Sequence, residues 1–543
     1  MTIDSPAAKD DHVVAETSDG VETPSSSITG VARGARSRLG SLIKRWPGVV
    51  LAGVMAVLIA VGYLLAAPMG RDLSAQMAHA QLAESHWPEI LNLRWYGGFN
   101  PLGYSVLSPP LMALLGVRLT TALGYVLTVV FFAALLKVTD VPRPVLGAVT
   151  GAVCLAGNLV VTRTTFELAL AVGLGALLAL VAGRLWLTSV LAVVAAVTSG
   201  VSGLFLGVAG GALFLSGRRR EGVVLAISGM LPTIAVGLAF GNGGRQSFAE
   251  DHALVGFIVC LAVAGLCWRR PVVRWGALLS ALLVVTAYLL PTQVGTTATR
   301  LPELFGPSVI MAVATVPLVV VVAGTVGAAL LLPPVSITEV QERGDPALSA
   351  AFYAPLLDQL KARGVEGPIE VVATQRRGEA AFVPPVVPIA RGWSRQIDIR
   401  RNPIFYDRTL NADTYRKWLD DNAISYVALS NGPYDWAASD EAKLLREGLP
   451  YLRSVWGDET WTLYAVTNPR PVISLPGQVI ARGPASLTVS APEPGAYQVR
   501  VRWYRYLSAS DGCMRPAEGG WSTLVVERPG TVTINGSLLP RHC

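Results

Sequence analysis

Long apolar runs, separated by short polar or basic segments, dominate the chain before residue 334. The first run, from Val49 to Ala67, holds about twenty apolar residues, enough at about 1.5 Å per residue to cross the hydrocarbon core of a bilayer. Ten further runs follow at 117–137, 144–161, 166–183, 186–199, 202–215, 223–240, 253–268, 275–291, 306–319 and 320–333. The pattern predicts a polytopic α-helical membrane protein with about eleven spans.

Two places leave the number of spans open. The stretch 186–215 is interrupted by Thr198–Gly203, which is either a tight turn between two half-depth helices or a flexible point within membrane helices. The stretch 306–333 has no charged break, only Pro317, so it forms either two helices or one kinked helix. One helix there reverses the side on which the C-terminal region lies.

Basic residues predict the orientation. Several precede the first run with no acid between them: Arg33, Arg36, Arg38, Lys44 and Arg45. Because Lys and Arg beside a span mark the cytoplasmic side, and because the basic loops 216–221 and 268–275 fall on that same side, the N-terminus is expected in the cytoplasm. The protein is then a multi-pass protein of the plasma membrane with its C-terminal region outside. A polar leader of about forty residues is too long for a signal peptide.

Composition agrees with a membrane protein, since 52% of residues are hydrophobic and 15% are charged, against about 25% charged in soluble domains. The net charge of +7 does not indicate a nucleic-acid partner, because the basic residues fall in short clusters that membrane topology explains. The expected partner is the lipid bilayer.

The chain divides into four parts. Residues 1–46 have the composition of a disordered tail with a basic end, 47–333 form the membrane domain, 334–469 alternate helix and strand patterns, and 470–543 consist of short strands between Gly and Pro. The last two parts predict an external α/β domain and an external β-sandwich. Within the sandwich, Asn535–Gly536 is typical of a hairpin turn.

Five cysteines occur, of which three sit in or beside apolar runs, where a thiol behaves as a small apolar group: Cys154, Cys260 and Cys267. Cys513 and Cys543 are the pair in the soluble region. An oxidising compartment lets them form a disulfide, with two unrelated free thiols as the alternative. No C-x-x-C spacing suggests a zinc site.

The first external loop, 68–116, is the longest polar excursion between spans, and such a loop is typically functional. Asp72 stands just past the first span, near the start of an amphipathic helix expected at the membrane interface from Asp72 to Trp87. We interpret Asp72 as the candidate catalytic carboxylate. A plain helix N-cap is the structural alternative.

Aromatic residues interleaved with Gly, Asn and Pro fill the rest of this loop. Trp95, Tyr96 and Tyr104 are candidates for stacking against a sugar ring. An aromatic belt at the membrane interface explains the same composition, because Trp and Tyr favour that depth.

Arginines near the ends of the spans are candidates for binding the phosphate of a lipid-linked substrate, since guanidinium matches phosphate oxygens bidentately. They are Arg300, Arg245, Arg163 and Arg94. Anchoring to anionic headgroups is the alternative for each. For Arg163, an ion pair with Glu167 one helical turn away is a further plain explanation.

These features together resemble the GT-C superfamily of polyprenyl-phosphate-dependent glycosyltransferases. Phrases around Arg94–Ser105, Val294–Leu301, Arg391–Asp398 and Trp418–Leu429 also look like a group of actinobacterial membrane proteins related to that superfamily. The resemblance implies transfer of a sugar, arabinofuranose or mannose, from a polyprenyl-phosphate donor to a cell-envelope glycan, lipid or protein.

By position, Asp72 inherits the role of catalytic base that the resemblance implies. Many such enzymes carry paired acids there, whereas this chain has a single Asp with Arg71 beside it, which is expected to keep Asp72 ionised or to form a simple ion pair with it. No cofactor is predicted, and a divalent cation is left open. A transporter or flippase of lipid-linked glycans and a non-catalytic envelope scaffold remain as alternative functions.

Overall fold

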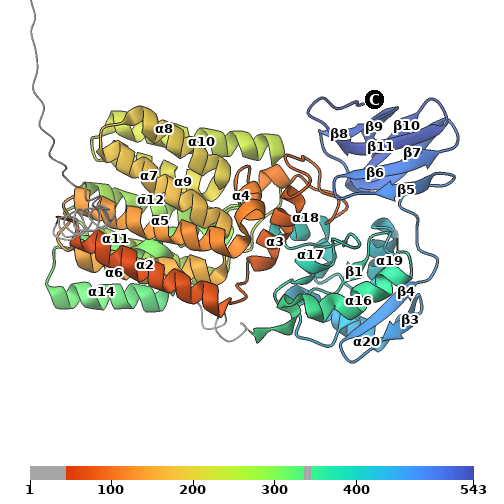
Figure 1. Cartoon of the computed structure of the whole chain (residues 1–543), viewed down its shortest axis with the longest axis horizontal. Coiled ribbons are helices and arrows are strands. Elements are labelled where there is room, and N and C mark those ends of the chain that lie inside the picture. Colours follow the sequence, from red (N-terminus) through yellow and green to blue (C-terminus); the bar gives the residue numbers. More distant parts are fainter. Residues whose placement is uncertain (1–44, 336–338, 340–343, 366) are drawn as a thin grey trace, which may run out of the picture. The chain divides into compact units, whose positions relative to one another are not determined.

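Each predicted membrane span forms a helix of its own in the computed structural model, which describes residues 45–335, 339, 344–365 and 367–543 (Figure 1). These eleven helices of the described residues are α2 (Pro47–Ala66), α5 (Val117–Val138), α6 (Pro144–Val161), α7 (Thr164–Val181), α8 (Leu185–Thr198), α9 (Gly200–Leu215), α10 (Arg219–Phe240), α11 (Glu250–Leu266), α12 (Pro271–Leu289), α13 (Arg300–Val313) and α14 (Leu318–Leu331). The tail predicted for residues 1–46 lies outside the described residues except for Arg45 and Trp46.

Hydrogen bonds between loops show that successive helices run in opposite directions. At one end of the helical domain the bonded pairs are Asp72 N–H to Val161 O (3.1 Å), Val106 N–H to Val197 O (3.0 Å) and Gln246 N–H to Thr292 O (2.9 Å). At the other end they are Arg143 Nη1 to Ala314 O (2.6 Å) and Arg270 Nη2 to Asp140 O (3.0 Å). The first end holds Asp72, and it is called the Asp72 end below.

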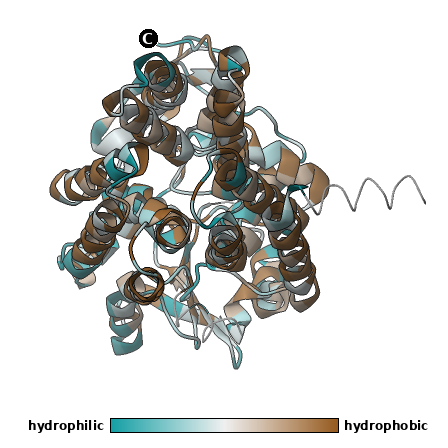
Figure 2. Ribbon diagram, turned by 90° about the vertical axis from the view of Figure 1, so that its left-hand side faces the viewer, coloured by the Kyte–Doolittle hydropathy of each residue, from teal (hydrophilic) through white to brown (hydrophobic). Residues whose placement is uncertain are grey.

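Six of these helices are long and apolar enough to cross a membrane: α2, α5, α6, α7, α10 and α12. Helices α8, α9 and α14 are apolar but shorter. Most of the helices are coloured hydrophobic along much of their length in Figure 2. Large aliphatic side chains on the surface of the domain are exposed, such as Leu65 at 81% and Leu330 at 77%. In water this much apolar surface is unfavourable, so it fits a lipid environment.

The two uncertain stretches each contain two helices. Ser199, with an extended backbone, separates α8 from α9, and Ala314–Pro317 separate α13 from α14. Helix α9 lies close against α10, because a Cβ on Gly210 would stand 2.6 Å from the carbonyl oxygen of Gly222. Small residues that allow such backbone approach are typical of helix pairs in membranes.

The first external loop contains α3 (Leu73–Ala83), the 3₁₀ turn η1 (Pro101–Gly103) and α4 (Ser108–Leu115). Helix α3 was expected to lie at the membrane interface, but nine of its eleven residues are buried, including Gln76 and His79. The expectation was wrong because α3 is covered by protein: α4 and α17 (Glu379–Phe382) of the next domain pack against it.

The α/β domain contains one four-stranded sheet of order β1-β2-β4-β3. Its strands are β1 (Glu370–Val371), β2 (Tyr426–Ser430), β3 (Leu452–Gly457) and β4 (Trp461–Val466), and its main helices are α16 (Ala350–Ala362), α17, α18 (Arg395–Arg401), α19 (Ala412–Asp421) and α20 (Ser439–Glu447). The pair β1–β2 is parallel and the other pairs are antiparallel.

The C-terminal part is a sandwich of two antiparallel sheets, of orders β7-β10-β9 and β5-β6-β11-β8. Its strands are β5 (Gln478–Arg482), β6 (Ser486–Ala491), β7 (Gly495–Arg502), β8 (Leu507–Ala509), β9 (Cys513–Pro516), β10 (Trp521–Val526) and β11 (Gly530–Gly536). Both sheets contribute to one core, for example through Val499 and Val532. The hairpin expected at Asn535–Gly536 is absent from this described part, because both residues pair with β8 inside β11.

Cys513 and Cys543, the pair expected to form a disulfide, are joined in the structure with their Cα atoms 5.1 Å apart. Among the described residues, Cys154, Cys260 and Cys267 are free and buried. The disulfide ties the last residue of the sequence to β9.

The aromatic part of the first external loop is built into the core of the α/β domain. Trp95 is 1% exposed, stacks on Phe99 at 5.3 Å and donates from Nε1 to the carbonyl oxygen of Ala380 (3.1 Å). Trp95 also forms an isolated parallel bridge with Ile389. The loop that carries Asp72 and the α/β domain therefore share a core.

Replacing Trp95 with Ala is expected to destabilise the protein by about 3–5 kcal/mol, because a buried ring and its hydrogen bond are lost. Thermal unfolding of the detergent-solubilised protein measures the change. Trp436→Ala is the matched control, because Trp436 is 64% exposed, and it is expected to cost less than about 1 kcal/mol. Equal effects of the two variants contradict the shared core.

Candidate functional site

Asp72 lies between α2 and α3, and its backbone is bonded to the turn between α6 and α7. Its N–H donates to the carbonyl oxygen of Val161 (3.1 Å). Gly70, two residues earlier, fits so closely against this turn that a Cβ there would stand 2.5 Å from Thr162 Oγ1. Thr162 itself adopts a left-handed conformation at φ 61° as it ends α6. The turn therefore fixes where α3 begins.

The carboxylate of Asp72 serves neither of the two structural roles expected as alternatives. It stands at the N-cap position of α3 but accepts no capping hydrogen bond. Arg71 pairs with Glu339 instead (Nε to Oε1, 3.3 Å), so the adjacent ion pair is not formed. Asp72 is 9% exposed and makes no side-chain hydrogen bond or ion pair with the described residues. The Asp72 carboxylate is thus free of structural partners among the described residues.

Two arginines lie within electrostatic reach of Asp72, namely Arg163 and Arg300. Arg163 Nη1 pairs with Glu303 Oε1 at 3.3 Å. Arg300 lies over the ring of Phe166, 5.1 Å from its centre, and no ion pair joins it to another residue in the part of the chain that the structure describes. Arg300 is therefore the cation with capacity left for an anionic ligand.

The ion pair expected between Arg163 and Glu167 does not form. Glu167 is fully buried and its Oε2 accepts from Asn158 Nδ2 (2.8 Å), while Arg163 reaches Glu303, which is 140 residues away in sequence. Glu303 is a member of the site that helical spacing did not identify, because its partner comes from another helix.

A series of hydrogen-bonded polar side chains, centred on Gln76 of α3, lines the site. Gln76 Nε2 donates to the Tyr104 hydroxyl (2.6 Å), and Gln76 Oε1 accepts from Thr165 Oγ1 (2.9 Å). The ring of Tyr104 stacks on His79 at 4.4 Å. Burial, with the charge of Asp72 as the next cause, raises the pKa of Tyr104, so the phenol stays protonated at neutral pH. Burial and the charge of Arg94 lower the pKa of His79 to about 3, which keeps this ring neutral.

Of the aromatic residues expected to stack on a sugar, only Tyr104 joins the described residues around Asp72. Trp95 lies in the shared core described above, and Tyr96 is 1% exposed with its hydroxyl donating to Ser394 O (2.9 Å). The stacking role expected for Trp95 and Tyr96 does not fit this burial. Their apolar area instead holds the loop to the α/β domain.

The remaining two arginines lie apart from the pair at Asp72. Arg94 is buried, and its Nη2 donates to the carbonyl oxygen of Ala78 in the middle of α3 (2.5 Å). Arg245 is exposed in the loop after α10, where no hydrogen bond or ion pair joins its side chain to another described residue. The structure thus brings together Asp72, Arg163, Arg300 and Tyr104.

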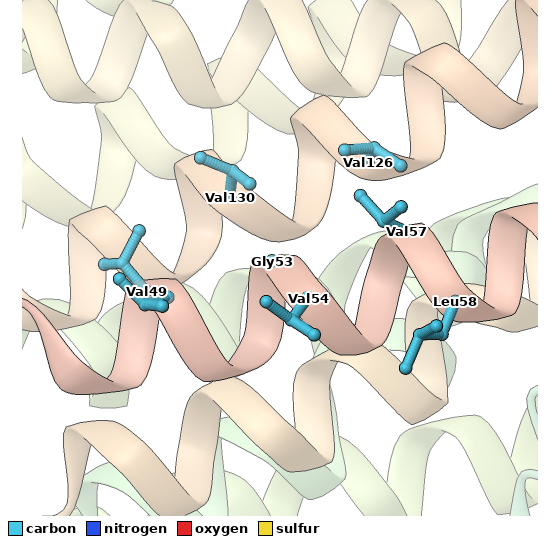
Figure 3. A pocket seen from close by; sticks show the side chains of 8 residues that line it. Val49, Gly53, Val54, Val57, Leu58, Val126 and Val130 are labelled. Carbon is cyan, nitrogen blue, oxygen red and sulfur yellow. The ribbon is translucent and has the colours of Figure 1, made fainter. Parts of the chain in front are cut away.

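Two cavities lie away from this cluster. One is an apolar groove of about 350 Å³ between α2 and α5, lined by Val and Leu side chains and by Gly53 (Figure 3). The other is a cleft of about 300 Å³ between the first external loop, residues 384–388 and β5, with Arg94 in its wall. Among the described residues, no group of three or more His, Cys, Asp or Glu side chains is placed to hold a metal ion.

No protein-family model and no curated protein matches the chain. Two solved structures of ArnT from Cupriavidus metallidurans are similar to it at 15% sequence identity. For the structure bound to undecaprenyl phosphate, the match covers 77% of this chain and 97% of the ArnT chain, with a TM-score of 0.40. The other, in the apo state, covers 79% and 98%, with a TM-score of 0.41.

Replacing Gln76 with Leu is expected to cost about 1–3 kcal/mol of stability, because the buried Tyr104 hydroxyl loses the donor Gln76 and the Thr165 hydroxyl keeps only Ser108 as a partner. Gln81→Leu in the same helix is the matched control, since the buried Gln81 Oε1 has no hydrogen-bond partner in the described structure, and it is expected to be neutral or stabilising. Thermal unfolding measures both. If Gln81→Leu lowers the stability as much as Gln76→Leu does, the hydrogen bonds of Gln76 do not account for the effect.

Proposed function

We propose that this protein is a membrane glycosyltransferase that moves a sugar from a polyprenyl-phosphate donor to a cell-envelope glycan, lipid or protein. The observation that carries the proposal is the Asp72 side chain, which is 9% exposed, makes no hydrogen bond or ion pair with the described residues and lies within electrostatic reach of two arginines. A carboxylate kept free of structural partners is suited to accept a proton from a bound hydroxyl.

The proposed step is a single displacement. Asp72 accepts the proton of the acceptor hydroxyl as its oxygen attacks the anomeric carbon of the donor sugar, and the bond between that carbon and the phosphate oxygen breaks. Polyprenyl phosphate leaves with the electron pair, and Arg300, with Arg163 beside it, offsets the charge that develops on the phosphate. One carboxylate and one displacement predict inversion at the anomeric carbon.

The distribution of basic residues supports an external location for this chemistry. Those at the opposite end of the helical domain include Arg143, Arg184, Arg218, Arg219, Arg220, Arg269 and Arg270. Loops rich in Lys and Arg tend to stay in the cytoplasm, which supports an outside location for the Asp72 end, the α/β domain and the disulfide-bonded sandwich.

The donor class follows from the charge and position of the site. A guanidinium without an ion-pair partner, at the end of a helical domain with an apolar surface, matches a phosphate held at the bilayer surface by an apolar tail. For the transferred sugar we propose arabinofuranose or mannose, which the sequence resemblance implies.

Asp72→Asn is expected to lower transfer by about 10²–10⁴-fold, the usual contribution of a positioned base, while the protein still folds. A deletion strain is complemented with wild type or variant at matched expression, and envelope glycans and accumulated polyprenyl-phosphate sugars are compared by mass spectrometry. Asp140→Asn is the control, because Asp140 is exposed at the opposite end of the helical domain.

Restoration by wild type and Asp140→Asn, but not by Asp72→Asn, supports the proposal and identifies the sugar. Equal restoration by Asp72→Asn removes the base role and favours a flippase or a scaffold.

Arg300→Gln is expected to reduce transfer about 10–10³-fold, because the leaving phosphate loses its cation. Arg245→Gln gives the comparison, since Arg245 is an exposed arginine of a neighbouring loop, and it is expected to change transfer by less than about threefold. Initial rates with membranes from the two strains measure this. A larger loss for Arg245→Gln would move the phosphate site to the loop after α10.

A further inference from the structure

The loop 374–378 of the α/β domain, between β1 and α17, is held rigidly from within its own domain. Arg377, at φ 53°, donates to the carbonyl oxygen of Gly392 (2.9 Å) and pairs with Asp398 (3.2 Å). Thr374 Oγ1 donates to Glu379 Oε2 (2.6 Å). This network gives the loop one conformation.

Arg376 projects from this loop to the segment that carries Asp72. Its side chain is 1% exposed, and its Nη1 donates to the carbonyl oxygen of Met69 (3.0 Å) and pairs with Glu339 Oε2 (3.1 Å). Ser74 Oγ donates weakly to the main-chain oxygen of Arg376 (3.5 Å). The contacts therefore fall on both sides of Asp72 in the sequence.

Glu339 extends the same connection to Arg71. Its Oε2 pairs with Arg376, and its Oε1 pairs with Arg71 Nε at 3.3 Å. Arg71 therefore pairs with Glu339 and not with Asp72, while Arg163 and Arg300 lie within electrostatic reach of Asp72.

We propose that Arg376 is a positioning residue for Asp72, through which the external α/β domain sets the place and the accessibility of the candidate carboxylate. The backbone bond from Asp72 to Val161 fixes the segment on the membrane side, and Arg376 fixes Met69 on the external side. Loss of either contact frees the segment Met69–Asp72 at one end. A carboxylate that accepts a proton from a substrate must be positioned to within about half an ångström.

The consequence for turnover rests on the proposed function. Arg376 touches neither substrate nor reacting atoms, so its loss is expected to lower kcat about 10–10²-fold with little change in KM. In an Asp72→Asn background the same change is expected to have no further effect, because a residue that acts only through Asp72 has nothing left to position.

Positioning itself can be measured without any assay of transfer. In an Asp72→Cys variant the new thiol reports on the segment, and the native cysteines give little background because three are buried and two form the disulfide. Labelling of this full-length protein with N-ethylmaleimide in detergent is expected to be about tenfold faster when Arg376→Gln is added, since the segment opens.

Two further variants complete the experiment. Arg446→Gln, an exposed arginine of the same domain, is expected to leave the labelling rate unchanged. Arg71→Gln, whose side chain is 56% exposed and so tolerates change, is expected to raise it about two- to threefold, and it provides the test if Arg376→Gln does not fold.

A labelling rate that stays at the level of Arg446→Gln in folded Arg376→Gln, or in Arg71→Gln if the former does not fold, overturns the inference whatever transfer shows. Faster labelling together with transfer that survives Asp72→Asn keeps the positioning role and removes the proposed catalytic one. Faster labelling with a loss of kcat confined to the Asp72 background supports both.

Discussion

The segment from Met69 to Asp72 is held from two sides by groups that lie far away in the sequence, and the candidate site depends on that. The turn after α6 accepts the N–H of Asp72, and Arg376 donates to the carbonyl oxygen of Met69. In both contacts the segment itself contributes a main-chain group, the N–H of Asp72 or the carbonyl of Met69. The start of α3 is therefore held largely without side chains of the segment. The side chains of Asp72 and Gln76 are then free to build a site.

Two of the acids around this segment, Glu339 and Glu303, are paired with cations. Glu339 takes Arg71 and Arg376, and Glu303 takes Arg163. Pairing of this kind offsets the desolvation of buried charges. What remains is Asp72, without a close partner in the described structure, and Arg300, whose guanidinium lies over an aromatic ring.

The sequence identified the helices well because their signal is local. An apolar run without charge predicts a helix from composition alone, and each of the eleven runs is one helix of the described chain. Local pattern also identified 470–543 as a region of short strands, but it misjudged Asn535 and Gly536, which are strand residues because β8 pairs with them. Tertiary pairing overrode a turn preference there.

The site was only partly predictable for the same reason. Asp72, Arg163 and Arg300 stand out as charges at the ends of apolar runs, and the structure brings all three together. The partners of these residues could not be read from spacing, because Arg163 pairs across 140 residues and Arg376 reaches back across 307. Trp95 and Tyr96 were misjudged because composition does not distinguish an aromatic surface from an aromatic core.

The Asp72 side chain, 9% exposed and without a hydrogen bond to the described residues, does not stabilise the start of α3. A Ser at the same N-cap position would satisfy an N–H of α3 without carrying charge into a site that is 9% exposed. The surrounding donors are instead committed elsewhere: Gln76 binds Tyr104, and Arg163 binds Glu303. No described residue uses the acceptor capacity of the Asp72 carboxylate. Under the proposed function, a hydroxyl of the bound acceptor supplies a hydrogen bond and the proton, while Arg300 offsets the charge of the anion that transfer releases.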